Sequence, residues 1–440
     1  MPDMSVIVLT PDNYATIRRL MAHLCAQTAC ERLEIVLVAP HIGRLHADEA
    51  ELARFAAVQL AEAAVLRSTA EARAAGVRAA TAPIVVFTED HSLPEPTWAA
   101  SLIRAHGEAW AAVGPAVSNA NPRSAVSWAN LLIEYIEWLH PASRGPTRHL
   151  PGHNSAYKRD VLLHYGAALG EWLEVESLLH WDLTANGRQL LLEPEARTHH
   201  LNYSRLSASI PLRFWSGKLF ATRRRRDWSL ARRLLYIAGA PIIPVVRLAR
   251  ILRHLQRPGR RVPRPACVLP VTAFLLACNT AGELAGYALG AGTASQRLVD
   301  LDFRRERFMS EADRQDLAAY PAAAGGPEGR LADRHRSRSR RGLQAGGDVD
   351  GVPDHGVALA HPPGQHLAGV DPDPQEEADV TRDLLVDPLH LGLHRQARAD
   401  SALGVVLVGD GGAEDSHHVV AYELVDRAAE AGHLIAEAAK

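Results

Sequence analysis

The sequence predicts an α/β fold, in which a mostly parallel, Rossmann-like sheet with flanking helices occupies residues 1–205. Short, continuous runs of apolar β-branched residues alternate there with amphipathic stretches, which is typical of parallel strands that helices bury on both faces. The composition then changes twice along the chain. We therefore expect a helical, membrane-associated region at residues 206–315 and a tail of little order at residues 316–440.

The first strands and the helix between them have clear local signals. SVIVLT, from Ser5 to Thr10, is a β-branched run that ends before Pro11, and LEIVLVAP is a second such run that ends at Pro40. The apolar positions between the two runs recur at helical spacing: Ile17, Leu20, Met21 and Leu24. A strand–helix–strand unit is therefore expected at the start of the chain.

The following elements are expected to extend the sheet. The stretch from Ala47 to Leu60 is rich in Ala, Glu and Leu and predicts a helix. AAVLRS, at residues 63–68, predicts a short third strand. A helix from Thr69 to Ala80 then leads into the strand PIVVFT.

The second region combines arginines with apolar residues. Arg223–Arg226 precedes an apolar run at Leu234–Val246, and a second run spans Ala266–Gly292. Neither run is an uninterrupted apolar span of about 20 residues. We predict helices that dip into or lie along the anionic cytoplasmic face of a membrane, with buried core helices as the alternative.

The last region loses its aromatic residues, because only Tyr422 follows Tyr320. DPDPQEEADV is typical of solvated chain, and VVLVGDGG lacks the lysine and the helix of a phosphate loop. The abrupt change in composition suggests the hypothesis that residues 320–440 are a frameshifted, non-native translation.

The bulk composition argues against several classes of protein. The formal net charge is -2, and no recognised nucleic-acid module accompanies the arginines, so we expect no nucleic-acid partner. The cysteines have no metal or disulfide spacing, which indicates a reducing compartment. The chain starts directly in a strand pattern, so we expect no signal peptide.

Polar side chains follow the strand PIVVFT. Glu89, Asp90 and His91 lie at its carboxyl end, where open parallel sheets bind ligands. Two carboxylates and an imidazole suit Mg²⁺ or Mn²⁺, and such an ion could hold a diphosphate. The alternative is a solvated turn or a helix N-cap, with Asp90 capping the helix ahead of PEPTW.

Several segments carry a resemblance in the same order. EARAAGVRAATAPIVVFTEDHSLPEPTW matches the pattern A-R-N-x-G, helix, strand, D-x-D, Pro, Trp, with E-D-H as the acidic motif. PGHNSAYKRDVL matches the loop G-x-N-x-x-x-R/K, and EVESLLHWDLTANGRQLLLEPEARTHH matches the pattern E-D, helix, Gly, strand, Pro-x-Ala, His. With SVIVLT and its helix, residues 4–205 resemble the family 2 glycosyltransferases with a GT-A fold. FWSGKLFATRRRRDWS and GELAGYALGAG resemble the membrane-associated tail of bacterial members.

The resemblance implies three groups of binding residues. The donor side comprises Thr10, Arg73, Glu89 and Asp90. The acceptor loop comprises Gly152, His153 and Asn154. The divalent metal, Mg²⁺ or Mn²⁺, is assigned to Glu89, Asp90, His91 and His200, with His199 as the alternative to His200. Because neighbours on a strand point to opposite faces, one of these two histidines is expected at the surface.

The resemblance also implies the reaction. Glu176 falls on the second acid of the E-D pair and would be the general base, with Glu174 as the alternative because the first acid is Val175 here. The enzyme would move a hexosyl group, with inversion, from a nucleotide-diphosphate donor to a lipid-linked sugar or polysaccharide. The reaction is expected at the cytoplasmic face of the inner membrane.

One departure from the family keeps a second function open. Members usually have an Asp after the second strand that holds the nucleobase, whereas VLVAPHIG has no acid. This difference leaves the nucleotide open and favours the alternative of a catalytically degenerate GT-A scaffold in a polysaccharide-assembly complex. A nucleotidyltransferase would need a Gly-rich phosphate loop after the first strand, and TPDNYATIRR has none.

Overall fold

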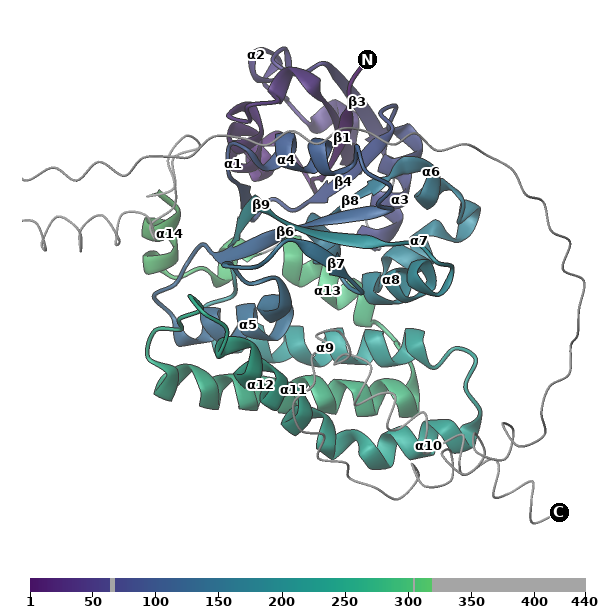
Figure 1. Cartoon of the computed structure of the whole chain (residues 1–440), viewed down its shortest axis with the longest axis vertical. Coiled ribbons are helices and arrows are strands. Elements are labelled where there is room, and N and C mark those ends of the chain that lie inside the picture. The colour runs from purple at the N-terminus through teal and green to yellow at the C-terminus, as the bar shows by residue number, and fades with distance from the viewer. Residues whose placement is uncertain (64–67, 304, 319–440) are drawn as a thin grey trace, which may run out of the picture. The chain divides into compact units, whose positions relative to one another are not determined.

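The computed structural model of the chain describes residues 1–63, 68–303 and 305–318 (Figure 1). Its centre is a nine-stranded sheet in the order β3-β2-β1-β4-β8-β6-β9-β5, with β7 paired to β9. The strands are β1 Met4–Leu9, β2 Leu33–Ala39, β3 Ala57–Glu62, β4 Ile84–Thr88, β5 Ser92–Pro94, β6 Ala112–Asn119, β7 Gly145–Thr147, β8 Ala156–Lys158 and β9 Leu190–His200.

The long strand pairs are parallel. They join β1 to β2 and β4, β2 to β3, and β6 to β9. The antiparallel pairs involve the short strands β5, β7 and β8. Alternate residues of β1 enter different cores, since Val6 and Val8 pack in one cluster and Ile7 and Leu9 in another. The expected mostly parallel sheet, buried on both faces, is therefore confirmed.

Helices flank this sheet and then form a separate layer. The first group is α1 Tyr14–Cys25, α2 Glu49–Leu52, α3 Thr69–Ala79, α4 Trp98–Ala105, α5 Ala125–Tyr135, α6 Arg159–Leu163, α7 Leu169–Leu173 and α8 Glu176–Ala185. The second group is α9 Leu206–Arg224, α10 Leu230–Gly239, α11 Ile243–Leu255, α12 Pro265–Leu289, α13 Ala294–Phe303 and α14 Glu311–Ala318. The 3-10 turns are η1 Cys30–Arg32, η2 Ile42–Arg44, η3 Ile136–Trp138, η4 Gly152–Asn154, η5 Gly166–Ala168, η6 Ala240–Ile242 and η7 Arg305–Phe308. The helical character expected for the second region is confirmed.

The helix expected from Ala47 to Leu60 is wrong over most of its length. Only α2 is helical there, and β3 follows it and pairs in parallel with β2. Without β3, the backbone groups on that side of β2 would lack partners, and this tertiary requirement overrides the local helix propensity. Most of the strand expected at residues 63–68 lies outside the described residues, as do VVLVGDGG and most of the tail.

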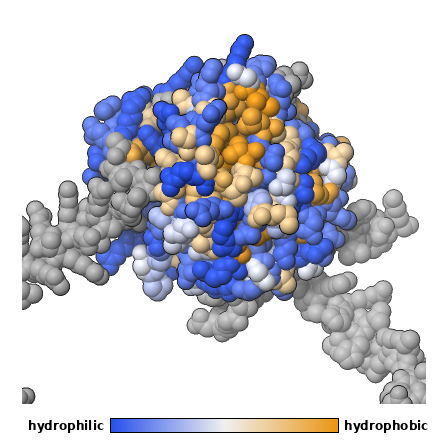
Figure 2. Space-filling view, turned by 90° about the horizontal axis from the view of Figure 1, so that it is seen from above, coloured by the Kyte–Doolittle hydropathy of each residue, from blue (hydrophilic) through white to orange (hydrophobic). Residues whose placement is uncertain are grey.

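Helices α9 to α12 lie together on one side of the sheet domain (Figure 1). α12 packs closely along α9, because a Cβ on Gly217 would overlap the carbonyl oxygen of Asn279 and one on Gly282 would overlap that of Phe214. The stretches Leu230–Leu255 and Pro265–Leu289 are long and apolar enough to cross a membrane, judged by length and composition alone. Figure 2 looks onto the side away from this layer, which is mostly hydrophilic around one hydrophobic patch.

Candidate active site

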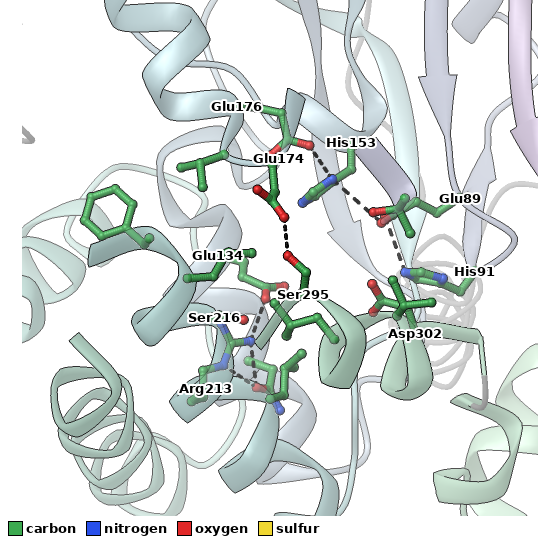
Figure 3. A pocket seen from close by; sticks show the side chains of 18 of the residues that line it. Glu89, His91, Glu134, His153, Glu174, Glu176, Arg213, Ser216, Ser295 and Asp302 are labelled. Atoms are coloured by element: carbon green, nitrogen blue, oxygen red, sulfur yellow. Dashed lines mark hydrogen bonds and ion pairs between the residues drawn. The ribbon is translucent and has the colours of Figure 1, made fainter. Parts of the chain in front are cut away.

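A cavity of about 230 Å³ lies at the carboxyl ends of β4 and β9 (Figure 3). Its walls come from α3, the β4–β5 turn, α5, η4, α8, α9, α13 and η7. The α9, α13 and η7 walls belong to the region that the sequence assigns to the membrane. The cavity therefore combines side chains from both of the expected regions.

Three side chains in this cavity form a candidate cation-binding group. Glu89, His91 and His200 each offer a ligand atom, and these atoms lie within 4.8 Å of one another. Glu89 Oε2 is 3.3 Å from His91 Nε2 and 3.5 Å from His200 Nε2. The pairing of β5 with β9 places Ser92 opposite His200, which brings the two imidazole rings to 4.9 Å between centroids.

The chemistry of this group suits Mg²⁺ or Mn²⁺. Glu89 Oε2 and His91 Nε2 are buried and 3.3 Å apart, but neither makes a well-directed hydrogen bond among the described residues. Burial opposes ionisation of Glu89, but His91, His153 and His200 hold the pKa of this carboxyl well below its usual range. An ionised carboxylate beside two imidazoles is a suitable ligand set for a borderline or hard divalent ion. The residues present therefore fit the expected metal.

Asp90, which the sequence places among the metal ligands, is not part of this group. Its Oδ1 lies 2.6 Å from His91 Nδ1, the ring nitrogen that does not face Glu89. A carboxylate in this position orients an imidazole whose other nitrogen binds a ligand. The N-cap alternative for Asp90 is also wrong, because α4 begins at Trp98 and its N-cap is Thr97.

Glu176 lies in the same cavity, at the first residue of α8. Its Oε1 is 2.7 Å from His153 Nδ1 and 2.9 Å from Arg73 Nη1. Burial acts to raise the pKa of Glu176, but the charges of His153 and Arg73 lower it to about 2. Burial acts to lower the pKa of His153, but Glu176 and Glu89 raise it to about 9. The carboxylate is therefore ionised and the imidazole protonated at neutral pH.

Gly152 lies against Glu176, because a Cβ at this position would overlap the Cβ and Cγ of Glu176. We predict that Gly152→Ala displaces Glu176 or η4 and lowers the free energy of unfolding by about 1–3 kcal/mol, the usual effect of overpacking. Gly145→Ala is the matched control, since a Cβ there meets nothing within 4 Å. Chemical denaturation of both variants checks the prediction, and equal stabilities would contradict it.

The carboxylate of Glu174 has different contacts from that of Glu176. It contacts Arg223 on α9 and Ser295 on α13, although Glu174 also lines the cavity. These contacts join the turn between α7 and α8 to two helices that are distant in the sequence. Glu174 thus has a structural task at the cavity wall, whereas Glu176 faces His153 and, beyond it, Glu89 (Figure 3).

The remaining expected residues fall into two groups. Arg73, Gly152 and His153 lie at the walls of the cavity or of its neighbour. Thr10 is buried and donates to Asn13 O at 2.7 Å, and Asn154 is buried; neither lines the two cavities.

The expectation that one of His199 and His200 lies at the surface is wrong. Both are buried, but His200 faces the cavity and His199 Nε2 lies 2.9 Å from Glu95 Oε1. The opposite directions follow from the alternation of side chains along β9. Layers packed on both faces of the sheet leave no surface position for either histidine.

Several cavity residues lie outside the motifs that carried the sequence analysis. Arg213, on α9, is 2.8 Å from Glu134 on α5, and both line the cavity. Asp302 and Arg305 line it from α13 and η7. A single arginine between apolar residues, as in PLRFW, was the available signal for Arg213, since a buried charge needs a partner. Asp302 and Arg305 had no comparable local signal.

A second cavity, of about 310 Å³, adjoins the first and shares Glu134, His153, Glu176 and Arg213 with it. Its other walls include Trp138 and Trp181, together with Arg247 and Arg250 on α11, and Phe220 lines both cavities. The shared side chains separate the candidate cation group from this aromatic cavity. Molecules bound in the two cavities would therefore both lie next to Glu176, which lines each cavity.

Comparisons with known proteins give little further information. No protein-family model and no curated protein matches the sequence. Among solved structures, the chain is similar to the mannosyltransferase PcManGT from Pyrobaculum calidifontis in complex with GDP-Man and Mn2+. The sequences are 20% identical, the match covers 78% of this chain and 84% of that chain, and the TM-score is 0.35. A likeness of this degree does not assign a function.

Proposed function

We propose that this chain is an inverting, metal-dependent family 2 glycosyltransferase with a GT-A fold. The observation that carries the proposal is one cavity that contains the candidate cation group and, across His153, the ionised carboxylate of Glu176. His153 Nδ1 lies 2.7 Å from Glu176 Oε1 and 4.0 Å from Glu89 Oε1. Such a pair of sites suits a reaction in which a diphosphate leaves on one side and a hydroxyl loses its proton on the other.

Glu89, His91 and His200 would hold the cation, and Asp90 would orient His91. When bound, a divalent ion supplies positive charge to the departing diphosphate of a nucleotide sugar. Arg73 and His153 add fixed positive charge beside the same position. This part of the cavity would therefore bind the donor.

Glu176 would take the proton of the acceptor hydroxyl. Both of its ion pairs are made by Oε1, so we assign Oε2 to the acceptor. A single displacement needs one base and inverts the sugar carbon. Arg73 and His153 keep the carboxylate ionised before the reaction and fix its direction.

The second cavity would hold the acceptor, a lipid-linked sugar or a polysaccharide end. Trp138, Trp181 and Phe220 offer apolar ring surfaces of the kind on which sugar rings pack. Access from a membrane suits this cavity, because α11 lines it through Arg247 and Arg250. Gly152 and His153 form the border with the donor side.

We further propose that residues 206–315 lie at the cytoplasmic face of the inner membrane, next to a GT-A domain at residues 1–205. Large apolar side chains of α10, η6 and α11 are exposed: Leu230, Leu234, Ile242, Val245 and Leu252. Arginines accompany them on the same segments, which suits an anionic leaflet. Residues 316–440 would be a tail, the third part of the chain.

The alternative, a degenerate GT-A scaffold in a polysaccharide-assembly complex, keeps one observation in its favour. β2 ends at Ala39 and is followed by Pro40 and His41, without the acid that family members use for the nucleobase. A scaffold would retain the fold without binding a donor. Donor binding therefore separates the two functions.

A thermal-shift screen of the full-length chain with UDP-, GDP- and TDP-sugars, with and without Mn²⁺, tests the proposal. A donor present at about 100 times its Kd should stabilise the protein by about 2.7 kcal/mol. Free Mn²⁺ with the matching nucleoside monophosphate is the control for unspecific effects. No shift with any nucleotide sugar, in either condition, would favour the scaffold.

A further inference from the structure

Helix α13 and η7 form one wall of the cavity that contains the candidate cation group (Figure 3). Ser295, Leu298, Val299, Asp302 and Arg305 line the cavity from this wall. None of these residues belongs to a motif of the family resemblance. Their role must be inferred from their contacts.

The wall is fastened directly next to His200. Arg305 Nη1 donates to Leu201 O at 2.7 Å, although the two residues are 104 positions apart. The Arg305 guanidinium also lies 4.3 Å above the ring of Tyr203, and Tyr203 OH donates to Leu301 O at 2.8 Å. These contacts fix α13 and η7 relative to the end of β9, where His200 offers its ligand nitrogen.

Asp302 extends from this wall toward Glu89 and His91 (Figure 3). Two carboxylates that share one cavity repel each other unless a positive charge lies between them. Arg305 pairs with Asp302, its Nη2 lying 3.4 Å from Asp302 Oδ1.

The ligand atoms of Glu89 and His91 lie close together without a well-directed hydrogen bond. Glu89 Oε2 and His91 Nε2 are buried, and the side chain of His91 is only 6% exposed. Buried polar atoms without such a bond are costly, and a bound cation would satisfy both. The place for a cation beside these two atoms therefore lies on the side of the cavity that Asp302 lines.

We propose that Asp302 is a further ligand of the divalent cation, opposite Glu89, His91 and His200, and that the cation holds α13 against the sheet. The inference rests on the proposed function for its cation site. A divalent ion held by these side chains would supply positive charge to the diphosphate of the donor. Cation binding and docking of α13 would then stabilise each other by reciprocal coupling.

Titration of the full-length chain with Mn²⁺ alone, followed by the paramagnetic resonance signal of free Mn²⁺, tests this proposal. Asp302→Asn is expected to raise the Kd for Mn²⁺ by about tenfold or more, and Asp302→Glu to restore part of the affinity. Asp300→Asn is the matched control on the same helix, because Asp300 is exposed and does not line the cavity. Its Kd should equal that of the unmodified chain.

Amide hydrogen exchange supplies a second readout that needs no variant. Mn²⁺ should slow exchange in α13 of the unmodified chain, and this protection should be absent in Asp302→Asn. An unchanged Kd for Mn²⁺ in a folded Asp302→Asn variant would overturn the proposal. So would a rate of amide exchange in α13 of the unmodified chain that is the same with and without Mn²⁺.

The outcomes also separate this proposal from the proposed function. If the unmodified chain binds no Mn²⁺, the role of Asp302 is refuted together with the cation site. If a nucleotide sugar then still binds in the presence of a chelator, the proposed glycosyl transfer stands and only its dependence on a metal is lost. If Mn²⁺ binds but Asp302 does not contribute, only the role of Asp302 is lost.

Discussion

Replacing Glu176 by glutamine is expected to lower kcat by about 10²–10⁴-fold, the usual contribution of a general base. The amide keeps the size of the side chain but cannot take the proton of the acceptor hydroxyl. Donor binding should change little, because the candidate cation group lies on the other side of His153. Release of nucleoside diphosphate from the donor found in the binding screen, with a lipid-linked acceptor present, gives the measurement.

The rival base provides the decisive comparison. Glu174→Gln loses contacts to Arg223 and Ser295, so we expect it to destabilise the cavity wall, which a lower Tm would report. A larger loss of kcat in Glu174→Gln than in Glu176→Gln would transfer the role of base to Glu174. Glu171→Gln, an exposed change on the preceding helix α7, controls for the loss of a surface charge.

His153→Gln examines the same base through pH. The positive charge of His153 is the largest effect that lowers the pKa of Glu176, to about 2, against the effect of burial. Glu176 therefore stays ionised over the whole ordinary pH range, and its protonation should not limit kcat/KM until strongly acidic pH. Without His153 the pKa of Glu176 rises, so the acidic limb of the profile, measured at saturating Mn²⁺, should move to higher pH. An acidic limb at the same pH in His153→Gln and in the unmodified chain would contradict the ion pair of His153 with Glu176.

Replacing Glu89 and His91 together by glutamine is expected to weaken Mn²⁺ binding by about 100-fold or more. Both side chains keep hydrogen-bonding capacity, which limits the cost of burial, but the anionic oxygen is lost. Of the group Glu89, His91 and His200, only His200 then remains. Thermal shift by Mn²⁺ and the paramagnetic resonance titration both measure the change.

A neighbouring acid–histidine pair makes a matched control for this double variant. Glu95, which directly follows β5, lies 2.9 Å from His199 on β9, and neither residue lines the cavity. Glu95→Gln with His199→Gln removes the same two functional groups and should leave the affinity for Mn²⁺ unchanged. Full Mn²⁺ binding by the Glu89 and His91 variant would refute the metal assignment while the fold stays as described.

The local pattern of the sequence was sufficient for several elements of the sheet. β1, β2 and β4 are continuous β-branched runs, and α1 and α3 have helical spacing, so each element could be recognised within its own residues. The position of Glu89 and His91 at a strand end was evident for the same reason. β3 was missed, because the pairing edge of β2 required it and its own composition favours a helix.

Tertiary structure decided which of two neighbouring residues points into the cavity. Pairing of β5 with β9 directs His200, and not His199, toward Glu89, and the start of α8 turns Glu176 toward His153. Asp302 lines the cavity because long-range contacts, among them those of Arg305 with Leu201 and of Tyr203 with Leu301, hold its helix at the end of β9. Sequence patterns report the period and polarity of one segment, and they determined the strands and the polar strand end. Long-range contacts decided which side chains share a cavity, because register and helix docking depend on residues far apart in the chain.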